Sequence, residues 1–224
     1  LTIMEEAQEL VNRITKGSGV LPQITSCSPG WINYMEYFYP ELIPHVSTCK
    51  SPHEMEGAII KSYFAKAHNI DPKDIFVVSV MPCTAKKGEA DRKQNAAVEG
   101  LPDVDAVITT RELAIMIKRA GLMFDLLPDE KFDDDLIGEY TGAGAIFGVT
   151  GGVMEAALRT AYHTLTGKEY EAIDFHACRG MDAVKEAEVE INGSKVKVAI
   201  TSGMKTAKPL LAEVKAGQSP YAFL

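Results

Sequence analysis

The spacing of apolar side chains along the chain predicts alternating helices and strands. Between residues 5 and 14, apolar side chains recur with the period of an amphipathic helix. Residues 75–81 and 104–109 are nearly continuous apolar runs, as expected for buried parallel strands. The sequence is therefore typical of a protein whose helices pack against sheets.

The same patterns predict the remaining elements. Further helices are expected at residues 29–38, 51–68, 111–120, 153–165 and 204–214. Short strands are expected at residues 23–25 and 173–178, and a hairpin at residues 185–191 and 195–201. Asn192-Gly193 matches the type I′ turn that such a hairpin needs. The fold class is thus α/β with one antiparallel hairpin.

Composition and charge exclude several function classes. The 224 residues carry a net charge of −8, which argues against nucleic-acid binding. No apolar run approaches the roughly 20 residues that span a bilayer. Residue 1 is not followed by a basic and then apolar leader. We therefore expect no membrane span, no nucleic-acid partner and a cytoplasmic location.

Both ends of the chain suggest a piece of a larger protein. The chain begins on Leu1 with a helix already starting, and it stops on the apolar, strand-like run of residues 219–224. We expect the terminal Tyr221, Phe223 and Leu224 to be exposed, as at a cut end.

The four cysteines are widely separated, which excludes a zinc finger and a disulfide scaffold and by itself favours inert thiols. Their neighbours change this interpretation. Cys27-Ser28-Pro29 and Ser51-Pro52 each place a polar residue before a proline that starts a helix, and Glu54 completes a capping box with Ser51. Cys83 lies two residues after Met81, which ends the apolar run, with Pro82 between them. Ligands of α/β sheets bind where strands end and helices begin, and thiolates are stabilised there.

Two motifs carry a resemblance to a known family. Residues 25–31, TSCSPGW, resemble the first signature of iron-only hydrogenases, TSCCPxW. Residues 81–89 match the second signature, MPCxxKxxE, at every fixed position. Further similarity covers residues 47–52, 105–113, 138–158 and 185–192, so the resemblance extends over essentially the whole chain.

The resemblance implies a fold, a cofactor and an activity. The family's catalytic domain has two lobes of mainly parallel twisted sheet flanked by helices, here roughly residues 1–145 and 146–224. The lobes hold the H-cluster, a 4Fe-4S cubane joined through a cysteine sulfur to a diiron unit with carbonyl, cyanide and a bridging dithiolate amine. It interconverts protons and electrons with dihydrogen, and ferredoxin or a partner subunit exchanges the electrons.

Matching positions assign roles around the H-cluster. Cys83 matches a cubane ligand, and Lys86 matches a donor to a diiron cyanide, although an ordinary exposed lysine is the alternative. His53 stands in the diiron pocket where the family has glutamine. The other residues that match the pocket lining are Met81, Pro52, Phe147 and Gly148. The remaining cysteines, Cys49 and Cys178, match no ligand; Cys178 is expected in the core.

Four residues match the family's proton path. These are Glu6, Glu9, Ser47 and Arg13. Positions 6, 9 and 13 fall on one helical face, so titratable groups can lead inward from solvent. The alternative from spacing alone is an i,i+4 surface ion pair between Glu9 and Arg13.

The first signature departs from the family pattern. Cys27 falls on the proton-relay cysteine and Ser28 on the cubane ligand. A serine hydroxyl is a poor iron ligand beside a thiolate. Ser28 ligates weakly, or Cys27 shifts to ligate iron, or the site is impaired.

The family's third signature, which supplies two more cubane cysteines, is absent, so the chain alone cannot hold a complete H-cluster. An alternative to the hydrogenase is a non-catalytic sensor or iron–sulfur assembly relative of the same superfamily. Another is a plain α/β binding domain. The glycine-rich residues 142–148 lack the spacing of a nucleotide loop and predict close backbone approach instead.

Overall fold

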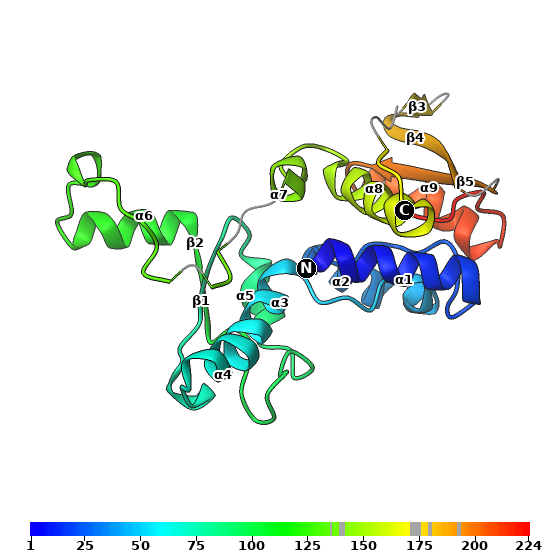
Figure 1. The fold of residues 1–224 in the computed structure, drawn as a ribbon. Helices are drawn as coiled ribbons and strands as arrows, with labels where there is room; N and C mark the ends of the chain where they lie inside the picture. The colour runs from blue at the N-terminus through cyan, green and yellow to red at the C-terminus, as the bar shows by residue number, and fades with distance from the viewer. Residues whose placement is uncertain (135, 139–141, 171–175, 179–180, 192–193) are drawn as a thin grey trace. The chain divides into compact units, whose positions relative to one another are not determined.

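The computed structural model describes all residues except 135, 139–141, 171–175, 179–180 and 192–193, and the chain forms two compact units (Figure 1). The first unit contains residues 1–27, 31–49 and 141–224, and the second contains residues 28–30 and 50–140. This division differs from the predicted lobes, because most of residues 1–49 belongs with the C-terminal part.

Two helices form the centre of the first unit. Helix α1 (Thr2–Lys16) lies beside α8 (Gly152–Thr166), and its Ala7 and Val11 pack against Ala161 of α8 (Figure 1). The predicted amphipathic helix is therefore confirmed, and it extends somewhat beyond residues 5–14. Burial of such an apolar stripe is what stabilises a helix of this length.

An antiparallel sheet packs on the same core. Strands β3 (His176–Cys178), β4 (Met181–Ile191) and β5 (Ser194–Thr201) pair in that order, with Val189 opposite Val196. The predicted hairpin is confirmed, whereas its Asn192-Gly193 turn and predicted strand residues 173–175 lie outside the described residues. The predicted strand at residues 23–25 is reduced to isolated bridges.

The end of the chain is buried, contrary to our expectation. Phe223 is 1% exposed and Tyr221 is 7% exposed. Phe223 forms isolated parallel bridges with Gln23 and Val198 and belongs to the main hydrophobic core. The apolar terminal residues therefore complete the first unit.

A second core cluster contains Ile24, Met35, Leu42, Leu211 and Val214. It joins helices of the first unit. These are α2 (Pro29–Phe38), whose first two residues belong to the second unit, the 3₁₀ helix η1 (Pro40–His45) and α9 (Met204–Lys215). The remaining helix of this unit is α7 (Gly142–Phe147). Within the described residues, none of the helices has the length and apolar character needed to cross a membrane.

The second unit begins with one continuous helical segment. It consists of α3 (Pro52–Ile59), a π-helical turn η2 (Ile60–Phe64) and α4 (Ala65–His68). In the π-helical turn, the buried Lys61 ammonium lies 2.6 Å from the Pro102 carbonyl oxygen and 2.7 Å from Asp105 Oδ2. A lysine this deeply buried requires such partners.

Two parallel strands follow. Strands β1 (Val78–Met81) and β2 (Ala106–Thr109) are shorter than the apolar runs that predicted them. Each leads at its carboxyl end toward a helix, β1 to α5 (Ala85–Ala90) and β2 to α6 (Thr110–Arg119). Short 3₁₀ turns η3 (Pro72–Asp74) and η4 (Phe124–Leu126) complete the unit.

The α/β class is confirmed, but parallel pairing is less extensive than expected. In the described part of the chain, the parallel sheet has two strands and the antiparallel sheet has three. The predicted capping box at Ser51 and Glu54 is wrong, because the Ser51 side chain makes no cap hydrogen bond and Glu54 is buried. A capping box forms instead at Thr109 and Glu112, at the start of α6.

Close packing at Gly57 gives a test of the second unit. A Cβ atom at Gly57 would lie 2.4 Å from the Asp103 carbonyl oxygen, whereas a Cβ at Gly88 would meet nothing within 4 Å. We expect Gly57→Ala to lower the free energy of unfolding by about 2 kcal/mol, in the range typical of overpacked sites. Urea denaturation checks this. Gly88→Ala, in α5, is the control and should be neutral or slightly stabilising.

Candidate functional site

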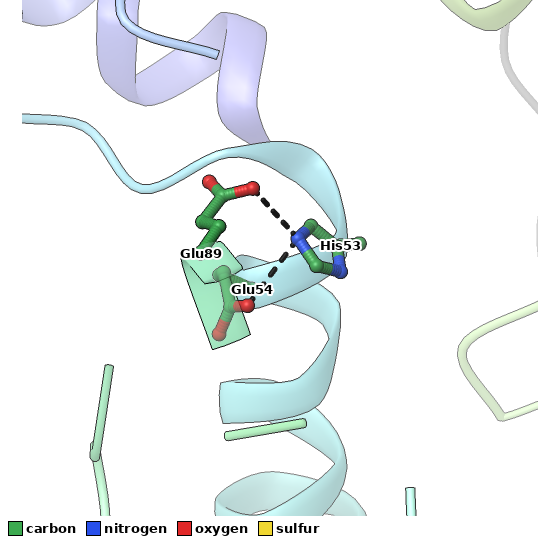
Figure 2. Close-up of side chains that lie close together, drawn as sticks. All are labelled: His53, Glu54 and Glu89. Atoms are coloured by element: carbon green, nitrogen blue, oxygen red, sulfur yellow. Dashed lines mark hydrogen bonds and ion pairs between the residues drawn. The ribbon is translucent and has the colours of Figure 1, made fainter. Parts of the chain in front are cut away.

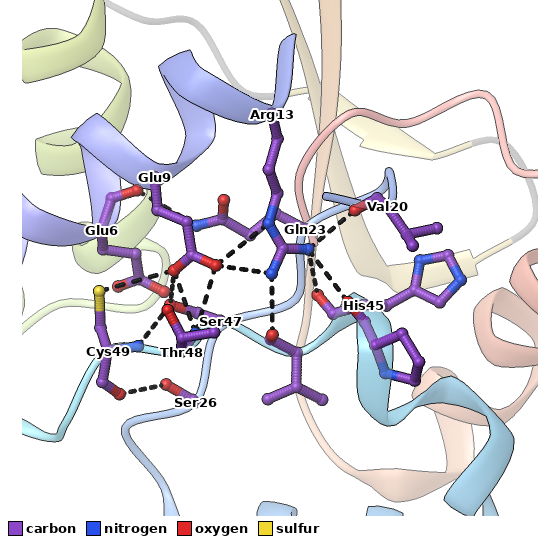
Figure 3. A network of polar contacts seen from close by, with 12 residues as sticks. Glu6, Glu9, Arg13, Val20, Gln23, Ser26, His45, Ser47, Thr48 and Cys49 are labelled. Carbon is purple, nitrogen blue, oxygen red and sulfur yellow. Dashed lines mark hydrogen bonds and ion pairs between the residues drawn. The ribbon is translucent and has the colours of Figure 1, made fainter. Parts of the chain in front are cut away.

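A buried network of polar groups lies along α1 in the first unit (Figure 3). The structure brings together four predicted site residues: Glu6, Glu9, Arg13 and Ser47. The three residues of α1 share one helical face, as their spacing predicted, and Ser47 approaches from the segment that follows η1. The network therefore does not depend on the second unit.

Glu9 is the centre of this network. Its Oε2 accepts hydrogen bonds from the Ser47 hydroxyl at 2.7 Å and from the Thr48 amide at 3.0 Å, and its Oε1 lies 2.6 Å from Arg13 Nη2. Burial raises the pKa of Glu9, but the hydrogen bonds from Ser47 and Arg13 outweigh this effect and lower the pKa overall. Glu9 is therefore held as a carboxylate.

Arg13 is buried, so the alternative of a surface ion pair with Glu9 is wrong. Its side chain is only 4% exposed. Besides Glu9, its guanidinium donates to backbone carbonyl oxygens, which are those of Val20, Pro44, His45 and Val46. The planar guanidinium satisfies all of these acceptors at once, which a lysine could not do.

The Glu6 carboxyl group has fewer hydrogen-bond partners than that of Glu9, and its pKa shifts in the opposite direction. It is 1% exposed, and its Oε1 has no hydrogen-bond partner. Burial, aided by the charge of Glu9, raises the pKa of Glu6 from 4.5 to about 7. A carboxyl group with such a pKa exchanges its proton near neutral pH, which is the property needed for proton transfer.

Cys49 also belongs to this network, although no role was predicted for it. Its Sγ lies 3.6 Å from Glu9 Oε2, and its amide donates to Ser47 Oγ at 3.2 Å. Burial raises the pKa of the Cys49 thiol to about 12, so the thiol stays protonated. Its place two residues after Ser47 is the only sequence signal that could have indicated this contact.

A second polar cluster lies in the second unit. Lys86 Nζ lies 2.7 Å from Glu89 Oε2. His53 Nε2 lies 2.9 Å from the same oxygen, and Figure 2 shows this contact between His53 and Glu89. Lys86 is buried, so the alternative of an ordinary exposed lysine is wrong. Burial raises the pKa of Glu89, but hydrogen bonds from His53 and Lys86 lower it overall. Glu89 was not among the predicted site residues, although it is the last fixed position of the second signature.

The other predicted residues of the second unit lie near strand β1. Cys83 is exposed and follows β1 immediately before α5. Met81, the last residue of β1, packs on the core formed by Val77, Val104 and Val107. Pro52 is exposed at the start of α3, and Ser28 is exposed in the short segment at residues 28–30.

The remaining predicted residues belong to the first unit. Cys27 is half-buried. Phe147 packs against the main core, and Gly148 is exposed. The close backbone approach expected within residues 142–148 is not found at Gly142, where a Cβ would meet nothing within 4 Å, or at Gly148, where the nearest atom would be at an ordinary 3.7 Å. It occurs instead at Gly152, where a Cβ would lie 1.8 Å from the Ile146 carbonyl oxygen. Glycine is thus required where α7 meets α8.

The donor set fits part of the predicted cofactor site. Cys83 presents an accessible thiol of the kind that ligates iron, and the buried Lys86 offers an ammonium donor to an anionic ligand. The high pKa of Cys49 makes it a poor ligand. Of the thiols that the structure describes, only Cys27 and Cys83 therefore suit a cluster. Four thiolates would have to include groups from outside this chain.

The raised pKa of Glu6 predicts how stability depends on pH. Because its pKa is about 7 in the folded state and 4.5 in the unfolded state, protonated Glu6 stabilises the fold below pH 4.5, and this stabilisation is lost as pH rises through 7. Relative to Glu6→Gln, the wild-type free energy of unfolding should fall by about 3 kcal/mol between pH 4 and pH 8. Urea titrations at several pH values check this. The adjacent exposed Glu5→Gln is the control, and an equal pH dependence of wild type and Glu6→Gln would contradict the assignment.

Comparisons with known proteins place the chain in a family. All residues, 1–224, match the model of the iron only hydrogenase large subunit, C-terminal domain. The chain is 55% identical to the periplasmic Fe hydrogenase large subunit of Nitratidesulfovibrio vulgaris, covering 100% of this chain and 53% of that protein. It is 49% identical to iron hydrogenase 1 of Clostridium pasteurianum, covering 100% of this chain and 38% of that protein.

A more distant relative and a solved structure extend this result. The cytosolic Fe-S cluster assembly factor narfl of Xenopus tropicalis is 32% identical over 100% of this chain and 48% of its own length. The structure of an apo FeFe-hydrogenase HydA1 variant from Chlamydomonas reinhardtii matches with a TM-score of 0.83 at 41% identity, covering 99% of this chain and 63% of that one. The chain thus spans between 38% and 53% of the length of these three relatives. It belongs to the iron-only hydrogenase large-subunit family, and residues 1–224 match the C-terminal domain of that subunit.

Proposed function

We propose that the chain is part of a longer hydrogenase that interconverts protons and electrons with dihydrogen. The observation that carries this proposal is the buried network of Glu6, Glu9, Arg13 and Ser47. Two carboxyl groups with opposite pKa shifts lie in one network, which suits the transfer of protons and has no evident use in cluster assembly.

Within this network, each residue has a distinct task. Glu6 takes up and releases the proton near neutral pH, because burial raises its pKa to about 7. The Ser47 hydroxyl, which can both donate and accept, lies on Glu9. Arg13 orients Glu9 and keeps it ionised. Cys27 is proposed to relay protons between this network and the cofactor.

The proposed cofactor is the H-cluster, completed by ligands from outside this chain. Cys83 would ligate the cubane, and Lys86 would donate to a cyanide of the diiron unit. Met81, Pro52, His53, Phe147 and Gly148 are proposed to line the pocket. When bound, the cluster supplies the electron transfer and the iron centre at which dihydrogen is formed or consumed.

The identity of the second ligand in this chain gives a direct test. Either Cys27 or Ser28 would ligate iron beside Cys83. After anaerobic reconstitution of the parent protein with iron and sulfide, Cys83→Ser should lower iron content, since thiolate is the preferred ligand. Cys178→Ser, outside the signatures, is the matched control. Loss of iron in Cys27→Ser assigns Cys27, and loss in Ser28→Ala assigns Ser28; full iron content in Cys83→Ser contradicts the proposed site.

The electron partner is proposed to be ferredoxin or an electron-transfer subunit. One relative, 47% identical over 99% of this chain, is named an NADP-reducing hydrogenase subunit of Solidesulfovibrio fructosivorans. We propose a cytoplasmic location, and the relative named periplasmic makes cell fractionation the direct test.

Hydrogen turnover tests the proposed activity. The 224-residue chain, loaded anaerobically with cluster, should show no turnover, because it offers at most two of four cubane ligands. The parent protein should be active, and its Glu9→Gln variant should lose at least about 100-fold in rate, in the range for a lost proton-transfer group. Glu5→Gln, on the exposed face of α1, should retain full activity. Turnover by the 224-residue chain would refute the incomplete ligand set.

A cluster-assembly or sensor function is the second candidate. Ser28 replaces a family cysteine, and a relative at 32% identity is named an assembly factor. An inactive parent protein that nevertheless transfers iron–sulfur clusters to apo acceptors would favour this function over the hydrogenase.

A further inference from the structure

Three consecutive residues, 47–49, surround one oxygen of the Glu9 carboxylate in the first unit (Figure 3). Ser47 donates from its hydroxyl and Thr48 from its backbone amide, and both hydrogen bonds end on Glu9 Oε2. The Cys49 sulfur lies 3.6 Å from the same oxygen, within hydrogen-bond range for sulfur. None of the functions proposed above uses this thiol.

In this contact the Cys49 thiol is the donor. Burial raises the pKa of Glu9, but hydrogen bonds from Ser47 and Arg13 lower it overall, so Glu9 is ionised. A carboxylate carries no hydrogen and can only accept. The thiol keeps its hydrogen, because burial raises its pKa to about 12. The hydrogen bond at 3.6 Å therefore runs from Cys49 Sγ to Glu9 Oε2.

The backbone of Cys49 is bound on both sides. Its amide donates to Ser47 Oγ at 3.2 Å, so this oxygen accepts from Cys49 while its own hydrogen goes to Glu9. The Ser26 hydroxyl donates to the Cys49 carbonyl oxygen at 2.8 Å. These two bonds fix the main chain of Cys49, and Figure 3 shows its side chain directed toward Glu9.

The surroundings of the sulfur are polar, which is unusual for a free cysteine. A half-buried cysteine commonly acts as a small apolar side chain that fills space. Here, besides burial, the charges of Glu9 and Glu6 also raise the pKa of the thiol, so the sulfur faces both carboxyl groups of the network. An apolar side chain at this position would remove one donor from a carboxylate that is only 15% exposed, and the loss of such a donor is costly.

We propose that Cys49 is a positioning residue of the proton network, whose thiol donates to Glu9 Oε2 and holds the carboxylate against the Ser47 hydroxyl. The role in proton transfer rests on the function proposed above for Glu9 and Ser47, whereas the hydrogen bond does not depend on that function. A serine hydroxyl can replace the thiol, because it also donates to a carboxylate. An alanine methyl group cannot.

Infrared spectroscopy of the 224-residue chain tests the hydrogen bond without the cofactor. The S–H stretching band of Cys49 is identified as the band that disappears in Cys49→Ser, since the other thiols remain. It should lie at lower wavenumber than the band of N-acetylcysteine methyl ester in an apolar solvent, where the thiol has no acceptor. In Glu9→Gln the Cys49 band should move to higher wavenumber, because an amide oxygen is a weaker acceptor than a carboxylate.

The control for this shift is Glu5→Gln, which makes the same change on an exposed residue of α1 and should leave the band in place. A wild-type Cys49 band at the position of the unbound thiol would overturn the proposal. A band that does not move in Glu9→Gln would do the same. The wild-type band decides even if Glu9→Gln does not fold.

Hydrogen turnover by the cofactor-loaded parent protein tests the positioning role. Cys49→Ala should lower the rate about 10-fold, because a carboxylate that is out of line transfers protons more slowly. Cys49→Ser should retain most of the wild-type rate. If Cys49 only filled space, this order would be reversed, because alanine keeps the apolar character that serine lacks.

Two results would reject the positioning role, namely a full rate in Cys49→Ala and equal losses in Cys49→Ala and Cys49→Ser. A wild-type parent protein without turnover would reject the hydrogenase proposal, and the role in proton transfer with it. The infrared result needs no turnover, so the hydrogen bond from Cys49 to Glu9 is decided separately from the proposed function.

Discussion

In the first unit, the guanidinium of Arg13 links helix α1 to the segments at residue 20 and residues 44–46 through hydrogen bonds. It binds the Glu9 carboxylate on its own helix and four backbone carbonyl oxygens, at residue 20 and at residues 44–46. Pro44 and His45 end the 3₁₀ helix η1, and carbonyl oxygens at the end of a helix lack partners within that helix, so a donor such as Arg13 satisfies them. The same contacts place Ser47 and Thr48 directly on Glu9. A single buried cation thereby determines the conformation of the segment on which the proton network depends.

Buried lysines play the corresponding part in the second unit. Lys61 connects the helical segment to the Pro102 carbonyl and to Asp105, the residue just before β2. Lys86 connects α5 to the His53 cluster through Glu89. Both units thus contain buried cations that pair with carboxylates. Within the described residues, each unit also contains a buried carboxyl group with an oxygen that has no hydrogen-bond partner, Glu6 in the first and Glu54 in the second. Such incompletely paired groups are the ones that respond to pH.

Local patterns predicted the helices well because their signal is contained in a short window. The apolar period identified α1, α6, α8 and α9, and the hairpin followed from alternation. Local signals failed where a distant contact competes for the same side chain. Glu54 matched a capping box, but its carboxyl group turns toward His53 instead. Tyr221 and Phe223 were expected to be exposed, but both are buried. Their burial could not be predicted locally, because contacts such as the bridges of Phe223 with Gln23 and Val198 join residues that are distant in sequence.

In the candidate site, too, local signals predicted some features, and features that depend on contacts between distant segments were missed. Spacing brought Glu6, Glu9 and Arg13 to one face, the second signature supplied Cys83 and Lys86, and the match to the family's proton path supplied Ser47. Neither spacing nor resemblance indicated that Lys86 and Arg13 are buried, since burial depends on the packing of segments far apart in sequence. Cys49 and Glu89 were missed because each acts only through a carboxylate or a cation that the fold brings to it.

The protonation of Cys49 has a consequence for the chemical reactivity of the protein. With a pKa of about 12, the thiol contributes only ~10⁻⁵ of its population as thiolate at pH 7, and the thiolate is the form that reacts. Peroxide and alkylating reagents should therefore spare Cys49 and attack the accessible Cys83 first. The burial that keeps the Cys49 thiol protonated beside the Glu9 carboxylate thus also protects this sulfur atom from oxidative damage.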